Sequence, residues 1–118
     1  MAKNSNFDYS TCPIRNVVSK FGDKWSFLVL YHLHISKILR FSELHHNMPD
    51  CSQKMLSVTL RRLEGMGLIN RKVYPEVPPR VEYSLTATGQ SLMPHVEALI
   101  NWAVEHFDEV VHKDDSAV

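Results

Sequence analysis

Residues 52–67 read SQKMLSVTLRRLEGMG, and this stretch predicts the helix around which the rest of the chain is organised. Ser52 is a good N-cap, because its hydroxyl can accept a hydrogen bond from a free N–H group of the first turn. Gly67 suits the left-handed conformation that ends many helices. We therefore expect a helix over about residues 52–66. At about 100° per residue, its inner side carries Met55, Leu56, Thr59, Leu60, Leu63 and Met66.

The opposite side of this helix has the chemistry of a DNA-reading surface. It carries Gln53, Lys54, Ser57, Val58 and Arg61, with Arg62 nearer the flank as a candidate phosphate contact. Glutamine can pair with adenine, and lysine or arginine can pair with guanine or bind phosphates. The free N–H groups at the helix start, together with Ser52, suit a phosphate. The competing interpretation is a solvated helix face, which most charged helix faces are.

The stretch NRKVYPEVPPRVEYSL at residues 70–85 predicts a stiff basic hairpin. Apolar and polar residues alternate in its second half, which favours strands over 68–74 and 80–85. Pro75, Pro78 and Pro79 restrict the tip and lower the entropy lost on docking. After a groove-binding helix such a hairpin is a wing, lying on the adjacent DNA backbone or minor groove. Its candidate DNA contacts are Arg71, Lys72 and Arg80.

The residues upstream predict three shorter helices. We expect a first helix from Pro13 to about Ser19, which Gly22 ends, and a second helix capped by Asp23. A connection at Ser36–Leu39 then leads to a third helix over Ser42–Asn47. The turn MPDCS at 48–52 then joins the third helix to the helix at 52–66. This is a helix-turn-helix arrangement, in which one helix enters the major groove while its neighbour braces the backbone.

A long C-terminal helix over about 87–112 follows, capped by Thr86, with Pro94 expected to kink or divide it. This helix is apolar on two sides. One stripe is enough to pack a helix on its own domain, whereas a second needs another surface, and a partner subunit is the simplest candidate. The residues expected to form the dimer are Leu92, Val96, Leu99, Ile100, Ala103, Val104 and Phe107.

The fold class that follows is mainly α with a small β-hairpin. A single winged helix-turn-helix domain is expected over residues 12–112, with dimerisation helices at both ends, a flexible N-terminus at 1–11 and a tail at 113–118. The 118 residues are 44% hydrophobic and 22% charged, as in ordinary globular proteins. No apolar run suits a membrane span and no signal peptide is recognisable, so we expect a cytoplasmic protein.

The formal net charge of +0 hides a separation of charge. Residues 52–72 hold five basic side chains against Glu64 alone, which gives +4. Residues 105–118 hold five acidic side chains against Lys113, which gives −4. A basic region and an acidic tail cancel in the sum but not in space, so a polyanion such as double-stranded DNA would still meet positive charge.

Several motifs together resemble the HxlR-type winged helix-turn-helix regulators, a bacterial group related in architecture to MarR proteins. They are Cys12-Pro13, GDKW at 22–25, RFSEL at 40–44, SQKML at 52–56, LRRLE at 60–64 and YPEVPPRVEYSLT at 74–86. The resemblance implies a homodimeric DNA-binding transcription regulator whose N- and C-terminal helices form the dimer. Asp23, Thr59, Arg62 and Cys51 depart from the usual pattern of the group.

The resemblance also implies a possible sensor, since some relatives respond to oxidants or electrophiles through the cysteine at the position of Cys12. That thiol precedes a helix whose first N–H groups favour a thiolate. The alternative is a buried small residue in the dimer seam. Cys51 precedes the helix at 52–66, where oxidation would disturb DNA binding, although an incidental turn residue is the simpler interpretation.

Other functions are weighed against the regulator. His32, His34, His45, His46, His95, His106 and His112 lack zinc-site spacing, so no metal and no cofactor is expected. An aromatic pocket around Trp25 and Phe27 would suit a ligand-responsive regulator without redox sensing. A winged-helix protein-interaction module is a further alternative, which the basic residues of the helix oppose. No nucleophile motif or carboxylate pair suggests an enzyme.

Overall fold

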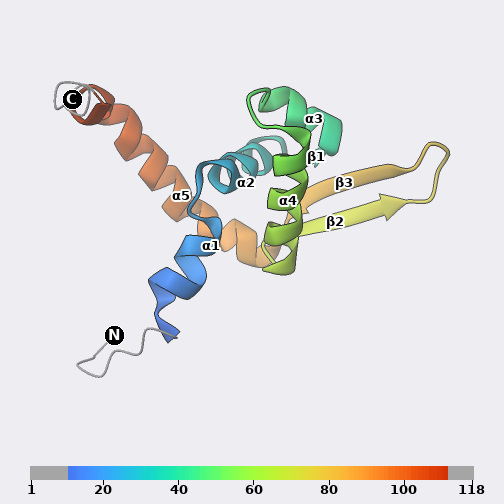
Figure 1. The fold of residues 1–118 in the computed structure, drawn as a ribbon, viewed down its shortest axis with the longest axis horizontal. Coiled ribbons are helices and arrows are strands. Elements are labelled where there is room, and N and C mark those ends of the chain that lie inside the picture. Colours follow the sequence, from blue (N-terminus) through green and yellow to red (C-terminus); the bar gives the residue numbers. More distant parts are fainter. Residues whose placement is uncertain (1–10, 112–118) are drawn as a thin grey trace.

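The computed structural model describes residues 11–111 as a helical body from which a β-hairpin projects (Figure 1). This confirms the expected fold class, mainly helical with a small sheet. The predicted N-terminal segment up to residue 10 and the tail at 113–118 lie outside the described residues. The elements in chain order are η2 (a π-helix, Ile14–Val18), α1 (Ser19–Phe21), α2 (Lys24–Ser36), β1 (Ile38–Arg40), α3 (Phe41–Asn47), α4 (Gln53–Gly65), β2 (Ile69–Tyr74), β3 (Arg80–Leu85) and α5 (Ala87–Glu105).

Helix α4 agrees with the prediction for residues 52–66 at both ends. The Ser52 hydroxyl accepts a hydrogen bond of 3.0 Å from the Met55 N–H, and Gly67 has a φ of 75°. The inner side is buried, with Leu56, Thr59, Leu60 and Leu63 at most 2% exposed. One residue placed on that side was wrong: Met55 is 41% exposed, because it lies at the edge of the apolar arc.

The sheet has three strands rather than the two of a hairpin, in the order β1-β3-β2, and all neighbours are antiparallel. Ser36–Leu39, expected to be a connection, therefore overlaps a strand. In β1 the buried Leu39 pairs with the buried Tyr83 of β3. A strand of three residues is too short to show alternation in the sequence. Its pairing is settled by β3, which is far away in the chain.

Helix α2 lies at the centre of the body, in contact with α4, α5 and β3. As expected, Asp23 caps it: one carboxylate oxygen accepts a hydrogen bond of 3.3 Å from the Ser26 N–H. Val29, Leu30 and Leu33 of α2 are buried in one continuous core. The helical stretch before it runs to Phe21, slightly beyond the expected Ser19, and ends at Gly22.

Helix α5 begins where expected, with the Thr86 hydroxyl accepting a hydrogen bond of 3.0 Å from the Gly89 N–H. Pro94 lies inside the helix without dividing it. The helix is interrupted at His106 instead, before a further helical turn at 107–111. The His106 ring nitrogen lies 2.9 Å from the Trp102 carbonyl oxygen, and a side chain that competes for a backbone acceptor favours such a break. The predicted end at residue 112 lies outside the described residues.

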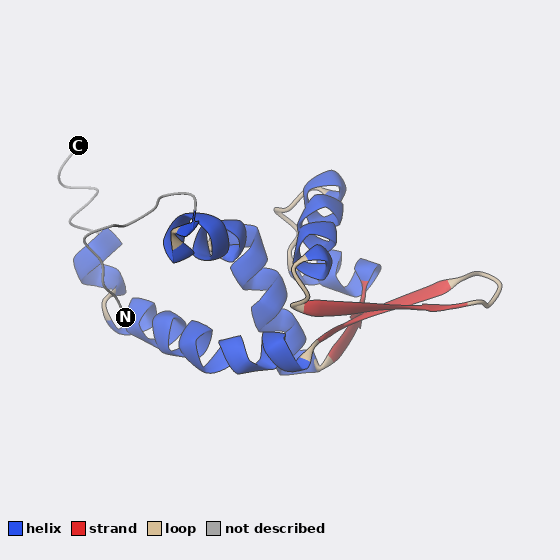
Figure 2. Cartoon of the chain, turned by 90° about the horizontal axis from the view of Figure 1, so that it is seen from below, coloured by secondary structure: helices blue, strands red, loops and turns tan. Residues whose placement is uncertain are grey.

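The arrangement separates two ends of the molecule. Seen edge-on in Figure 2, the hairpin of β2 and β3 extends from one end of the helical body, while the later part of α5 extends from the other. No helix among residues 11–111 is both long enough and apolar enough to cross a membrane.

Gly89 lies where the first turn of α5 packs directly against the backbone of Leu68, in the turn between α4 and β2. A Cβ atom there would overlap the backbone carbonyl oxygen of Leu68, which itself accepts a hydrogen bond of 3.0 Å from the Thr86 N–H. We expect Gly89→Ala to lower the free energy of unfolding by about 1–3 kcal/mol in urea unfolding followed by circular dichroism.

Gly65→Ala is the matched control for that substitution. A Cβ atom at Gly65 would meet nothing within 4 Å, and the residue is helical. The control should therefore be neutral or stabilise the protein by up to about 1 kcal/mol. Equal stability of the two variants would contradict the close approach of α5 to Leu68.

Candidate nucleic-acid interface

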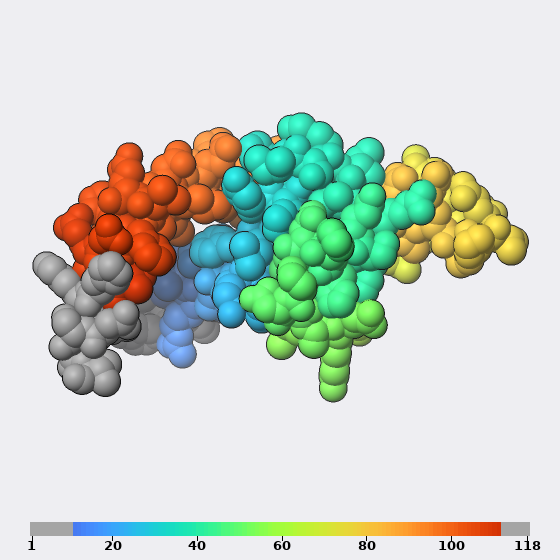
Figure 3. Space-filling view, turned by 90° about the horizontal axis from the view of Figure 1, so that it is seen from above, coloured from blue at the N-terminus to red at the C-terminus, as the bar shows by residue number. Residues whose placement is uncertain are grey.

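The outer face of α4 is set by what its inner face buries. Because Leu56, Thr59, Leu60 and Leu63 are fixed in the core, the residues on the opposite side of the helix must point to the surface. The exposed residues of that surface are Gln53, Lys54, Val58 and Arg61, and Ser57 is half-buried. In the space-filling view of Figure 3, α4 (green) lies at the surface of the helical body, and the wing (yellow) projects beyond that body.

A groove of about 370 Å³ separates α4 from the wing. Its α4 side is lined by Ser57, Arg61 and Glu64, and its wing side by Arg71 and Tyr83. Arg71 is directly opposite Tyr83 in the register of β2 and β3, and directly opposite residues share a face of the sheet. The fold therefore brings two arginines that are ten positions apart in the sequence to the same groove.

The cations of this region fall into two groups: those outside any ion pair of the described residues, and those that are ion-paired within the chain. Lys54, Arg61 and Arg71 are exposed, and their charges have no ion-pair partner among residues 11–111. An unpaired cation on a groove wall is available to a phosphate, and each neutralised phosphate releases bound counterions. These three residues are therefore available to attract a polyanion on this side of the molecule.

Arg62 belongs to the second group, because it is ion-paired within the chain, and its expected phosphate contact stays a prediction. Its guanidinium donates hydrogen bonds of 3.1 Å to the Asp23 carboxylate and 3.2 Å to the Ser26 hydroxyl. These bonds attach α4 to the start of α2. Burial raises the pKa of Asp23, but the hydrogen bonds from Ser26 and the charge of Arg62 outweigh it, so the pKa lies below its ordinary value.

Arg80 is likewise held within the wing. Its guanidinium lies 3.2 Å from the Glu76 carboxylate, 3.6 Å from the Glu82 carboxylate and 3.9 Å from the centre of the Tyr74 ring. Lys72 lies over the same ring at 4.9 Å. Two carboxylates offset most of the positive charge of Arg80, so this side chain stiffens the hairpin more than it attracts DNA.

Two residues of the groove were not singled out in the sequence. Glu64 follows Arg61 by three positions, so helical spacing alone would have placed it beside that arginine. Tyr83 could be assigned to the groove only once the register of β2 and β3 was known. Glu64 adds the one negative charge among the residues that line the groove. Tyr83 is buried and forms part of the groove wall.

Comparisons with known proteins show which family the chain belongs to. The family model for the HxlR-like helix-turn-helix matches residues 20–111. The chain belongs to this family. An HTH-type transcriptional regulator of Methanothermobacter thermautotrophicus is 52% identical over 95 residues, which cover 80% of this chain and 72% of the relative.

Solved structures of HxlR-like proteins superpose on most of the chain. The redox regulator HypR in its reduced form has a TM-score of 0.79 and 37% identity, covering 86% of this chain and 99% of HypR. The oxidized form of HypR has a TM-score of 0.74 and 39% identity, covering 80% of this chain and 96% of HypR. The transcriptional regulator ytfH from Salmonella typhimurium has a TM-score of 0.79 and 38% identity, covering 90% and 94%. This chain is a transcriptional regulator of the HxlR type.

Both cysteines of this HxlR-type regulator are buried. Cys12 is 5% exposed at the start of the first helical stretch, and Cys51 is 1% exposed. Cys51 belongs to the hydrophobic core, so it is a packing residue rather than an incidental turn residue. Burial, followed by the charge of Asp50, raises the pKa of the Cys51 thiol. A thiol held neutral in this way is a poor nucleophile.

The residues expected to form the dimer divide between the core and the surface. Val96 is 3% exposed and already packed within its own chain, and Leu92 and Ile100 lie against the core. Leu99, Val104 and Phe107 are each more than half exposed, and Ala103 is exposed. In the N-terminal helical stretch, Ile14, Val17 and Val18 are exposed as well.

The remaining candidate sites have simpler roles. No group of three or more metal-ligating side chains gathers within residues 11–111. Trp25 and Phe27, considered for an aromatic ligand pocket, are partly buried against the core.

Proposed function

We propose that this HxlR-type regulator binds operator DNA as a homodimer, with α4 in the major groove and the wing on the adjacent backbone or minor groove. The observation that carries the proposal is a set of three cations, on the outer face of α4 and in the groove beside it, that have no ion-pair partner among the described residues: Lys54, Arg61 and Arg71. A groove helix without such cations would suit a protein-interaction module instead.

The roles of the individual residues follow from where they lie. Gln53, Lys54, Ser57 and Arg61 present hydrogen-bonding groups to base edges, and the exposed Val58 can contact a thymine methyl group. Ser52 and the first N–H groups of α4 bind a phosphate. Arg71 and Lys72 hold the backbone beside the wing. Arg62 and Arg80 act indirectly, by holding α4 and the hairpin in position.

A second copy of the chain is the partner that the exposed apolar residues suit. Leu99, Val104 and Phe107 on α5, with Ile14 and Val17 near the N-terminus, are large apolar side chains left on the surface of one chain. Exposed apolar patches of this kind mark protein–protein contacts. The protein works in the cytoplasm, where its DNA is, and acts by binding rather than as an enzyme.

Response to thiol oxidants through Cys12 is a second proposal, favoured by the likeness to HypR, a redox regulator known in reduced and oxidized forms. We expect diamide to abolish operator binding by the wild type, and a reductant to restore it. Cys12→Ser should bind in both conditions, whereas Cys51→Ala should keep the response. A Cys12→Ser protein that still loses binding with diamide would contradict the assignment.

Arg61→Ala tests the DNA-binding surface. Fluorescence anisotropy titrations with DNA from around the protein's own gene, and with random DNA, give the affinity for each. We expect Arg61→Ala to weaken operator binding by about 1–3 kcal/mol and to reduce the preference over random DNA, because a base contact is lost. Arg71→Ala should weaken binding to both DNAs alike and lower the salt slope by about one.

Arg62→Ala is the matched control, since it removes an adjacent arginine that is bonded to Asp23 and Ser26. Measured at a temperature where the variant is folded, it should leave the ratio of operator to random affinity unchanged. Equal loss of preference in Arg61→Ala and Arg62→Ala would show that the outer face of α4 does not read the bases.

A further inference from the structure

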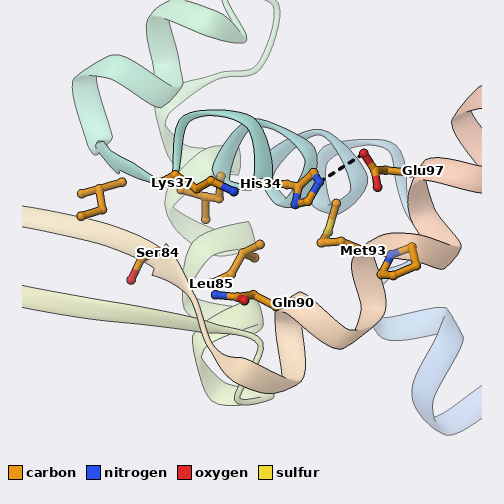
Figure 4. Close-up of a pocket in the computed structure, with 10 residues that line it drawn as sticks. His34, Lys37, Ser84, Leu85, Gln90, Met93 and Glu97 are labelled. Atoms are coloured by element: carbon orange, nitrogen blue, oxygen red, sulfur yellow. Dashed lines mark ion pairs between the residues drawn. The ribbon is translucent and has the colours of Figure 1, made fainter.

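A second hollow of about 420 Å³ lies where the end of α2 meets the start of α5, next to β1 and β3 (Figure 4). Its lining is drawn from α2, β1, β3 and α5, and none of the lining residues is a DNA contact in the proposal above. A volume of this size is in the range of sites for small organic molecules.

The base of the hollow is apolar. It includes Leu33, Leu85 and Met93, which are at most 8% exposed, and Ile38 and Pro94 lie beside them. The ten lining residues include no phenylalanine, tyrosine or tryptophan. Without rings to stack on, this surface suits an aliphatic body rather than a flat aromatic one.

The polar side of the hollow has one charged group that is not in an ion pair of the described residues. The His34 ring nitrogen lies 3.1 Å from the Glu97 carboxylate, so these two side chains are partners across the space between α2 and α5. The ammonium group of Lys37 has no ion-pair partner among residues 11–111. Figure 4 shows the side chains of Lys37 and Gln90 extending into the space between the end of α2 and the start of α5.

The backbone at Lys37 is a second, independent observation. Lys37 caps α2 with φ 74° and ψ −57°, and its N–H donates a hydrogen bond of 2.9 Å to the Leu33 carbonyl oxygen. It is the one residue other than glycine with positive φ among those the structure describes. Glycine adopts this conformation without strain, whereas a lysine does not. Strained residues of this kind gather at binding sites.

We propose that this hollow binds a small organic carboxylate with an aliphatic body. The carboxylate pairs with the Lys37 ammonium group and accepts a hydrogen bond from the Gln90 amide, while the chain lies on Leu33, Leu85 and Met93. The charged group without an ion-pair partner among the described residues is the Lys37 ammonium, whereas the Glu97 carboxylate already lies 3.1 Å from the His34 ring nitrogen. An anion therefore fits the site, and an amine does not.

The consequence for regulation rests on the proposed function. The hollow joins α5, which carries the apolar surface assigned to the partner copy, to β3, which forms the wing. A ligand that prefers one arrangement of these elements changes operator affinity. Unchanged affinity at saturating ligand would overturn this regulatory role.

Binding itself is tested without DNA, so that its failure is separate from a failure of the regulator proposal. The full chain is labelled with 13C in the methionine methyl groups, and the Met93 signal is assigned with Met93→Leu. Hexanoate is then titrated, with hexanamide as the uncharged probe and hexylamine as the cationic one. We expect a saturable shift of the Met93 signal with hexanoate and a much weaker response to the other two.

Variants of Lys37 decide whether the charge matters. Lys37→Gly removes the ammonium group and suits the φ of 74°, so the fold is preserved. We expect it to bind hexanoate about tenfold to a hundredfold more weakly, and Lys37→Arg to restore most of the affinity. The proposal is overturned if hexanoate causes no saturable shift. Equal binding of hexanamide, or full binding by Lys37→Gly, overturns it as well.

Discussion

Burial of the inner face of α4 is the constraint on which the described structure depends. Leu56, Leu60 and Leu63 are almost completely removed from water and belong to the same core as the centre of α2. Rotation of α4 about its axis would expose these side chains, at a cost of roughly 1.5–3 kcal/mol for each. The bonds from Arg62 to Asp23 and Ser26 hold the same helix at its flank. The outer face, with Arg61, is therefore presented in one orientation.

The ion pairs of the basic residues explain why a chain with no net charge can attract DNA. The basic residues do not act alike. Arg62 and Arg80 are used within the molecule, where carboxylates of Asp23, Glu76 and Glu82 offset them. Lys54, Arg61 and Arg71 have no ion-pair partner within residues 11–111, and they lie on one side of the molecule. The distribution of pairing, rather than the total charge, determines where a polyanion is attracted.

Much of this could be predicted from local signals in the sequence. Ser52, Asp23 and Thr86 each cap the helix that follows them, because capping depends on residues three positions apart. The wing was recognisable from alternation and prolines. β1 could not be predicted, since three residues show no period and its pairing depends on β3. The bond of Arg62 to Asp23 could not be predicted either, because it joins residues 39 positions apart that only the fold brings together.

The candidate site was predictable in its residues more than in its geometry. The outward position of Arg61 and the inward position of Leu60 could be predicted, because helical spacing alone separates them. The meeting of Arg61 with Arg71 required the three-dimensional fold, as did the internal use of Arg80. The position of Lys37 beside an apolar hollow could not be predicted from the sequence, because the residues that line the hollow come from α2, β1, β3 and α5.

A hydroxyl-radical footprint of the complex with operator DNA would test the central claim most directly, that two copies of α4 and the wing hold the duplex. We predict two equivalent protected regions related by two-fold symmetry, centred one helical turn or about 34 Å apart, with weaker protection beside each where the wings lie. A single protected region without symmetry, or uniform protection on any DNA sequence, would contradict the account.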